Sequence, residues 1–305
     1  MKPKLAAFPK CYMDDLCVHH TMTVAQWIEL AATLGVEGLE FYSGFIEDNP
    51  AFLRETKACL ERHRLRMPML CCSPDFTNPD PDGRKRAIDR EAELIGVARR
   101  LGGPRTVCRV LSGQSYPEVD RRQGLEWVIE GINRVLPVAR EHDVVLGLEN
   151  HYKDGFWSYP EFAQKMDVFL DVLAAIPDRD HFGVQYDPSN AIVAGDDPIE
   201  LLRAVADRVV SMHASDRYLA EGATLDDLRQ TDGTLGYSPN LRHGVTGKGL
   251  NDYDTIFRIL ADHGYRGWIS IEDGMNGMDE MAESLAFLRR MAARYFPAST
   301  TPTPL

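Results

Sequence analysis

Four polar side chains follow four short apolar segments of the chain. The segments VVLGLEN, FGVQYDPSN, VVSMHASDR and GWISIEDG carry, near their ends, Glu149, Asp187, His213 and Glu272. Three carboxylates held close together would repel one another strongly, and a divalent cation removes that repulsion while leaving positions open for substrate oxygens. The set therefore predicts one bound divalent metal. Oxygen donors with a single imidazole favour Mn²⁺ as the first choice, with Mg²⁺, Co²⁺ or Zn²⁺ as alternatives.

Each of these residues also has an ordinary structural interpretation. A strand-end Glu or Asp can cap the following helix, and a single His is more often a hydrogen-bonded core residue than a ligand. The metal site is predicted because all four residues fall at equivalent strand ends, where side chains from neighbouring strands converge.

Two further residues lie close to Glu149 in the segment ENHYKDGFW. His151 can act as an acid or a base at neutral pH, and its alternative is a loop histidine bonded to the backbone. Trp157 can stack on a sugar or aglycone ring, or it can simply cover the rim of the fold. We take both as candidates for contact with a substrate.

The elements that must position these residues follow a regular order. Eight runs rich in Val, Ile, Leu and Phe alternate with longer stretches of helical spacing, which is the pattern of βα units around a parallel sheet. The predicted strands are Leu5–Phe8, Gly38–Phe41, Met67–Cys72, Thr106–Val110, Val144–Glu149, Phe182–Asp187, Val209–His213 and Trp268–Glu272. Eight such units close into a single (β/α)8 TIM barrel with its active site at the C-terminal strand ends. An open doubly wound sheet would usually show a Gly-rich phosphate loop after its first strand, and AAFPKCYMDD has none.

We expect residues 1–296 to form one TIM-barrel catalytic domain. Residues 218–249, after the seventh strand, are predicted to be a long irregular loop, and its length favours a lid or a partner surface. Residues 297–305, PASTTPTPL, are predicted to be a disordered tail.

The composition limits the partners and the compartment. The net charge is −12, and no run of Lys or Arg could neutralise several phosphates, so nucleic acid and anionic membranes are unfavourable partners. No segment approaches the ~20 apolar residues of a membrane span, and MKPKLAAFPK lacks an apolar stretch of signal-peptide length. The 6 cysteines form no CxxC pair, so free thiols are expected. We predict a cytoplasmic protein.

The motifs GLEN, YDPSN, HASDR and SIEDG, in this order, resemble the xylose-isomerase-like TIM-barrel superfamily of sugar isomerases and epimerases. The resemblance covers the chain to about Phe296 and includes GVTGKGLNDYDTIFRILADHGYRGWISIEDG. It implies that the four residues named first bind one metal, and that Glu149 and Glu272 exchange a proton with the carbon beside the substrate carbonyl. Arg217 matches an arginine that contacts substrate oxygens in the epimerases, and a surface salt bridge is its alternative.

The chain departs from the ketose epimerases at Asn190, where many of them have a substrate-contacting His. Together with His151, this pattern resembles the large metal-binding subunit of C-glycoside deglycosidases. Those enzymes act on 3-oxo-glycosides by enolisation followed by loss of the aglycone. By this resemblance His151 would be the base, and Asn190 would contact the substrate.

We therefore expect a metal-dependent sugar isomerase or epimerase that removes a proton next to the carbonyl of a keto-sugar. The alternative is an enolising lyase that expels the aglycone of a 3-oxo-glycoside after the same first step. A DNA-repair endonuclease on this barrel would need more histidine ligands and a basic face. A non-catalytic subunit would hold metal without exchanging protons. The expected partner is a small sugar or glycoside, and a homo-oligomer or a second type of subunit stays open.

Overall fold

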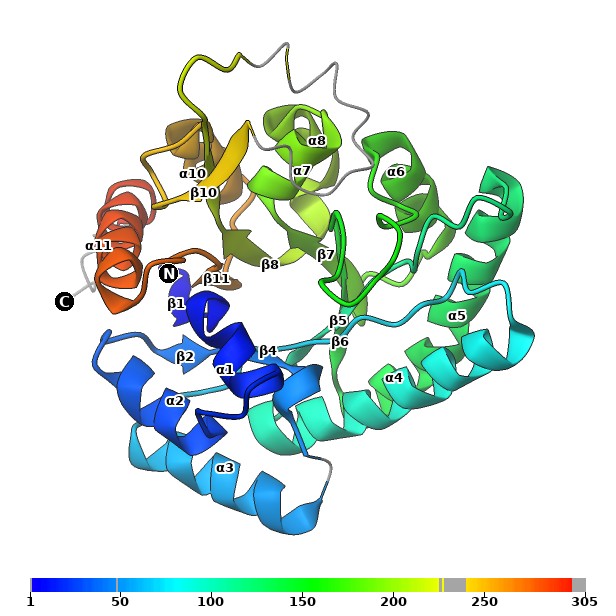
Figure 1. The fold of residues 1–305 in the computed structure, drawn as a ribbon, viewed down its shortest axis with the longest axis horizontal. Coiled ribbons are helices and arrows are strands. Elements are labelled where there is room, and N and C mark those ends of the chain that lie inside the picture. Colours follow the sequence, from blue (N-terminus) through cyan, green and yellow to red (C-terminus); the bar gives the residue numbers. More distant parts are fainter. Residues whose placement is uncertain (1, 48, 225–226, 228–239, 298–305) are drawn as a thin grey trace, which may run out of the picture.

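The computed structural model describes residues 2–47, 49–224, 227 and 240–297. A ring of parallel strands occupies the centre, and helices surround it (Figure 1). The strands pair in the order β2-β1-β11-β8-β7-β6-β5-β4-β3. Their bounds are β1 (Lys4–Ala7), β2 (Gly38–Leu39), β3 (Phe41–Tyr42), β4 (Met69–Cys71), β5 (Val107–Val110), β6 (Val145–Glu149), β7 (Phe182–Tyr186), β8 (Val209–Ala214) and β11 (Trp268–Ile271).

The two ends of this ladder belong to one stretch of chain. β2 pairs with β1, β3 pairs with β4, and Glu40 alone separates β2 from β3. The Glu40 amide donates to the Ala7 carbonyl oxygen at 3.0 Å, and the Leu39 amide donates to the Arg66 carbonyl oxygen at 2.8 Å. The ladder therefore closes on itself, and the predicted single (β/α)8 barrel is confirmed. All eight predicted strands are present, and the second is divided at Glu40.

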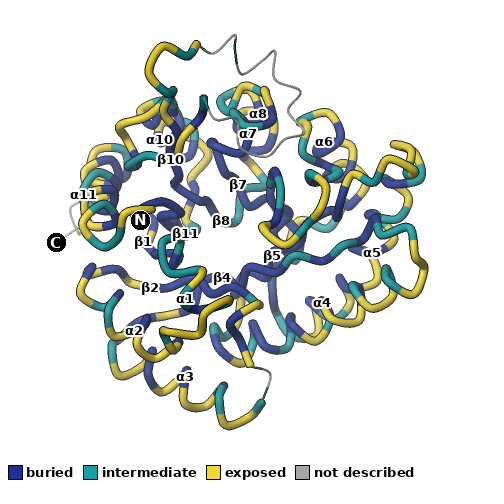
Figure 2. The backbone as a smooth tube through the Cα atoms, in the orientation of Figure 1, coloured by how far each residue is buried: buried dark blue, intermediate teal, exposed yellow. Residues whose placement is uncertain are grey.

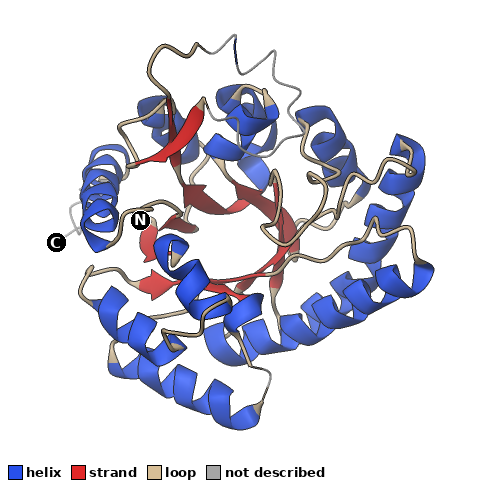
Figure 3. Cartoon of the chain, in the orientation of Figure 1, coloured by secondary structure: helices blue, strands red, loops and turns tan. Residues whose placement is uncertain are grey.

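Helices form the outer layer of the barrel (Figure 3). Several begin at a side chain that accepts a backbone amide of the first turn, as Asn49, Asp80 and Asp120 do. The α-helices are α1 (Met13–Cys17), α2 (Val24–Ala32), α3 (Pro50–Arg62), α4 (Pro81–Gly102), α5 (Arg121–His142), α6 (Met166–Ala175), α7 (Pro188–Ala194), α8 (Pro198–Val205), α10 (Tyr253–Asp262) and α11 (Met278–Tyr295). The 3-10 turns are η1 (Lys10–Tyr12), η2 (Ser43–Phe45) and η3 (Ala206–Arg208).

The core lies between the strand ring and the inner faces of the helices, where the chain is buried, while the outer faces are exposed (Figure 2). Large side chains such as Trp27, Phe169 and Phe257 are fully buried there. This burial supplies the main favourable contribution to folding and fixes the strand ends relative to one another. Among the described residues, no helix is both long enough and apolar enough to cross a membrane.

The prediction of an irregular loop over residues 218–249 is wrong in part. β9 (Asp216–Leu219) and β10 (Leu241–Gly244) pair as an antiparallel ladder. The Asp216 carboxylate fixes the return of the chain by accepting the amides of Gly247 and Gly249, each at 2.9 Å. The two strands are far apart in sequence, so local patterning does not reveal their pairing. Residues 225–226 and 228–239 of this loop, and residues 298–305 of the predicted tail, lie outside the described residues.

Candidate active site

Four consecutive positions around the ring bring the predicted metal ligands together. Glu149 ends β6, Asp187 follows β7, His213 lies in β8 and Glu272 follows β11. One ligand atom from each lies within 4.8 Å of the others, and all four residues are buried. The parallel pairing of β6, β7, β8 and β11 produces this convergence, because it aligns the C-terminal ends of neighbouring strands.

The Glu149 carboxylate is held by groups from other strands. Its Oε2 accepts a hydrogen bond from Arg109 Nη1 at 2.7 Å, and its Oε1 accepts one from Asn190 Nδ2 at 3.3 Å. Burial alone would raise the pKa of Glu149, but the charges of Arg109 and His213 outweigh it and lower the pKa to about 2. Glu149 is therefore an anion with few directions left for new partners.

His213 lies between two carboxylates. Its Nε2 is 2.7 Å from Glu40 Oε2, and its Nδ1 is 3.1 Å from Glu149 Oε1. Burial works to lower the pKa of His213, but Glu40, Glu272 and Glu149 together raise it well above its usual value. A carboxylate on the far ring nitrogen is the usual way of fixing the orientation of a metal-binding imidazole.

Asp187 has one oxygen free to face the centre. Its Oδ1 accepts the amides of Ser189 and Asn190 and the Ser215 hydroxyl, whereas its Oδ2 is buried and has no hydrogen-bond partner in the described part of the chain. Burial, followed by the negative charges of Glu272 and Glu149, raises the pKa of Asp187 to about 7. A buried carboxylate oxygen without a partner beside two further carboxylates fits a divalent cation.

A cavity of about 550 Å³ opens over these strand ends. We call it the mouth cavity; its polar lining includes Lys10, Asp14, Arg109, His151, Asn190, Arg217 and Glu272. Glu149, Asp187 and His213 are not part of the lining, so they lie deeper than Glu272. Among the titratable groups that line this cavity, His151 and Glu272 are the two that the sequence identified as candidates for proton transfer.

His151 is mostly buried and is backed by a second acid. Its Nδ1 lies 3.3 Å from Glu161 Oε2, and the other Glu161 oxygen accepts the Ser112 amide at 2.8 Å and its hydroxyl at 2.9 Å. Burial would lower the pKa of His151, but Glu149 and Glu161 raise it. The carboxylate of Glu161 favours a proton on Nδ1, which leaves Nε2 for exchange.

The structure brings two of the three predicted substrate-binding residues to the mouth cavity. Asn190 and Arg217 line it, and both are buried. Trp157 does not line it, whereas its neighbour Phe156 does. The Trp157 amide closes a turn by donating to the Asp154 carbonyl oxygen at 3.1 Å, and this turn presents Phe156 to the cavity.

Sequence reasoning missed Lys10, Arg109 and Glu40. Lys10 Nζ lies 3.2 Å from Glu272 Oε1, and Arg109 reaches Glu149 from the neighbouring strand β5. Arg109 and Glu40 stand inside apolar strand sequences, VCRV and GLEFY. A charged residue at a position that should be buried is a signal that could have identified both.

The family follows from the sequence match. The profile of the xylose isomerase-like TIM barrel family matches residues 28–291, so the chain belongs to this family. Inosose dehydratase of Clostridium botulinum (strain Eklund 17B / Type B) is 24% identical over 270 residues, which cover 85% of this chain and 84% of that protein. The chain is therefore an enzyme of this family.

Solved structures share the fold over almost the whole chain. D-psicose 3-epimerase with D-tagatose, from Clostridium cellulolyticum H10, gives a TM-score of 0.71 at 18% identity and covers 95% of this chain and 99% of its own. The IolI protein with a bound zinc atom gives 0.70 at 15% identity, over 97% and 100%. At these identities the likeness shows the fold alone.

Proposed function

We propose that this protein is a divalent-metal-dependent lyase that removes the proton beside the carbonyl of a keto-sugar and then expels the substituent on the next carbon. The observation that carries the proposal is the different placement of the acid-base groups relative to the mouth cavity. Glu149 is engaged by Arg109 and lies below the mouth cavity, whereas His151 and Glu272 line it. Exchange of a proton between Glu149 and Glu272, as an epimerase would require, is therefore disfavoured.

The metal would be held by Glu149, Asp187, His213 and Glu272. Their mutual distances, their burial and the unpartnered Oδ2 of Asp187 support this assignment. We propose Mn²⁺ because the donor set is mainly oxygen with one imidazole. When bound, the ion would polarise the substrate carbonyl and stabilise the negative charge that develops on its oxygen.

His151 is the proposed base. Its Nε2 takes the proton from the carbon beside the carbonyl, while the Glu161 carboxylate lies 3.3 Å from the opposite ring nitrogen and supplies a negative charge there. The electrons of the broken C–H bond form a carbon–carbon double bond, and the bond to the leaving oxygen breaks with its electron pair. The leaving oxygen then takes up the proton, so the products are an unsaturated ketone and an alcohol, a phenol or water.

The rim of the mouth cavity supports a leaving group larger than water. Val18, Phe156 and Met275 line this cavity and are 52%, 68% and 45% exposed. Exposed apolar side chains around a cavity of this volume suit a ring attached to the sugar. We therefore propose a 3-oxo-glycoside as the substrate, with dehydration of a keto-polyol as the smaller variant of the same reaction. The relative named inosose dehydratase supports elimination as the reaction type.

The test uses purified enzyme loaded with Mn²⁺ and an aryl 3-oxo-glycoside. We expect release of the phenol, and we expect His151→Gln to slow it by about 10²–10⁴-fold while the metal content stays unchanged. His263→Gln is the matched control, because His263 is exposed and lies outside the site. Near-normal turnover in His151→Gln would exclude His151 as the base.

Epimerisation is the second candidate, because Glu272 as well as His151 lines the mouth cavity and two such groups could return a proton to either face of the carbon. A free ketose incubated in D₂O distinguishes the two. Deuterium in the recovered sugar, with inversion and without release of any product, would support the epimerase.

A further inference from the structure

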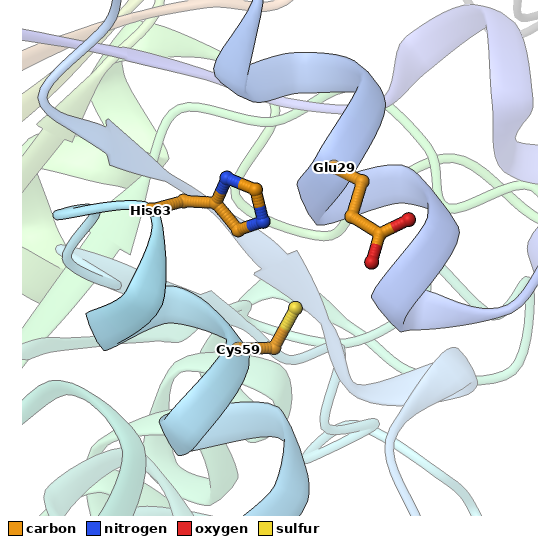
Figure 4. A group of neighbouring side chains, drawn as sticks. All are labelled: Glu29, Cys59 and His63. Atoms are coloured by element: carbon orange, nitrogen blue, oxygen red, sulfur yellow. The ribbon is translucent and has the colours of Figure 1, made fainter.

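A second cluster of metal-binding side chains lies on the outside of the barrel. Glu29 comes from the C-terminal half of α2, Cys59 from the last turn of α3, and His63 directly follows α3. One ligand atom from each lies within 4.8 Å of the other two. Figure 4 shows the imidazole, the thiol and the carboxylate around one common space between the two helices.

The three side chains do not satisfy one another. Within the described part of the chain, the only hydrogen bond between any two of Glu29, Cys59 and His63 joins backbone atoms, from the His63 amide to the Cys59 carbonyl oxygen at 3.2 Å, and no hydrogen bond or ion pair joins their side chains. Their separations are wider than hydrogen bonds. A tetrahedral zinc ion with bonds of about 2.0–2.3 Å would draw its ligands about 3.3–3.8 Å apart, so small side-chain rotations would close the cluster around it.

The chemistry of the donors points to a borderline-soft cation. Cys59 and His63 are four residues apart, so they project from the same face of the helix end. A thiolate and an imidazole favour Zn²⁺ over Mg²⁺ or Ca²⁺, and the Glu29 carboxylate supplies the second negative charge. The C-terminus of α3 also carries a partial negative charge that favours a cation beside it.

We propose that Glu29, Cys59 and His63 form a zinc site that joins α2 to α3, with water as the fourth ligand. Helix C-termini in this fold lie at the N-terminal ends of the strands, which is the end of the barrel that contributes to stability rather than to chemistry. The site therefore acts as a structural clip, separate from the metal centre under the mouth cavity. It is a zinc site and not a second catalytic centre.

Cobalt distinguishes the two centres, because Glu149, Asp187, His213 and Glu272 include no thiolate. We expect EDTA-stripped enzyme titrated with Co²⁺ to develop the near-ultraviolet absorption of a cobalt–thiolate bond and to reach a plateau by about two equivalents, because both metal centres can take Co²⁺. Cys59→Ser should abolish this absorption. Cys71→Ser should keep it, although Cys71 is the thiol that lies beside His213 and Glu40.

His63→Ala provides a second variant in case Cys59→Ser perturbs the buried end of α3, since His63 is only partly buried. We expect it to lose about one equivalent of bound zinc and to melt at a lower temperature in zinc, with turnover of the sugar substrate unchanged. Absence of the cobalt–thiolate absorption in the unaltered protein, or its persistence in Cys59→Ser, would overturn the proposal.

Discussion

The Glu149 carboxylate is shared among groups from three other segments of the chain. Arg109, Asn190 and His213 each approach one of its oxygens within 3.3 Å. These contacts keep the carboxylate ionised and fixed in direction, which suits a metal ligand better than a base. His151 is the proposed site of proton transfer because it has fewer partners and lines the cavity.

The contact between His213 and Glu40 predicts an effect on metal affinity. Glu40→Gln removes the negative charge that orients the imidazole, so we expect Mn²⁺ affinity to fall by about 10–100-fold. Competition with a chelator measures it. Glu37→Gln is the control, because Glu37 is exposed and lies three residues away. Equal affinities in the two variants would contradict the role of Glu40.

The buried ion pair between Arg109 and Glu149 predicts a large cost when only one partner is removed. Arg109→Met leaves a buried carboxylate without its cation, so we expect a loss of about 3–5 kcal/mol in the free energy of unfolding of the metal-free protein. Loading with metal should restore part of it. Urea unfolding with and without metal measures both values.

The exposed Arg105 provides the comparison for this prediction. It pairs with Asp180 at 3.2 Å on the surface, and Arg105→Met should cost about 0–1 kcal/mol. Similar losses in the two arginine variants would contradict the prediction that Arg109→Met leaves Glu149 as a buried charge without a partner.

At the scale of elements, α4 packs a carboxylic acid against the barrel wall. Glu91 is buried on α4, and Cys108 Sγ of β5 donates to its Oε1 at 3.4 Å. Burial raises the pKa of Glu91 to about 8. In the unfolded chain the pKa is near 4.5. Between these values the unfolded chain loses its proton while the folded protein keeps it, so stability falls as pH rises.

Glu91→Gln removes this pH dependence, because an amide has the same shape and does not ionise. As the pH rises from 5 to 8, we expect the stability of the variant relative to the unaltered protein to increase by about 1.4 kcal/mol per pH unit, which amounts to a few kcal/mol over this range. Denaturant unfolding at both pH values measures the gap. A gap that stays constant with pH would show that Glu91 does not keep its proton on folding.

The order of strands and helices could be predicted from the sequence, whereas the contacts between segments far apart in the chain could not. Apolar runs ending in Glu149, Asp187, His213 and Glu272 repeat at the spacing of βα units, so periodicity alone places these residues at one end of a barrel. The β9–β10 pairing was missed because its strands are short and belong to segments separated by a long connection.

At the scale of the whole molecule, the closed ring makes the proposed metal centre part of the folded state. Its four ligands come from segments spread over more than a hundred residues, so the unfolded chain cannot assemble them. A ligand that binds only the folded state stabilises it by mass action. Metal and folding are therefore expected to be linked.

Removal of the metal should lower the melting temperature. With Mn²⁺ at a hundred times its dissociation constant, we expect a stabilisation of about 2.7 kcal/mol, which EDTA removes. The measurement is made in the Cys59→Ser variant, so that a metal ion bound at the proposed zinc site between α2 and α3 does not contribute to the change in melting temperature. His213→Ala in that background should abolish the response to Mn²⁺. A full response in His213→Ala would place the ion elsewhere.

The sequence by itself determined the barrel, the set of residues at the C-terminal ends of its strands and the family to which the chain belongs. These depend on local periodicity and on motifs that can be read along the chain. The tertiary structure decided which way each side chain faces: Glu149 down toward Arg109, His151 into the mouth cavity and Lys10 onto Glu272. Such directions depend on the register of strands and loops that meet only after folding, and no local pattern encodes them.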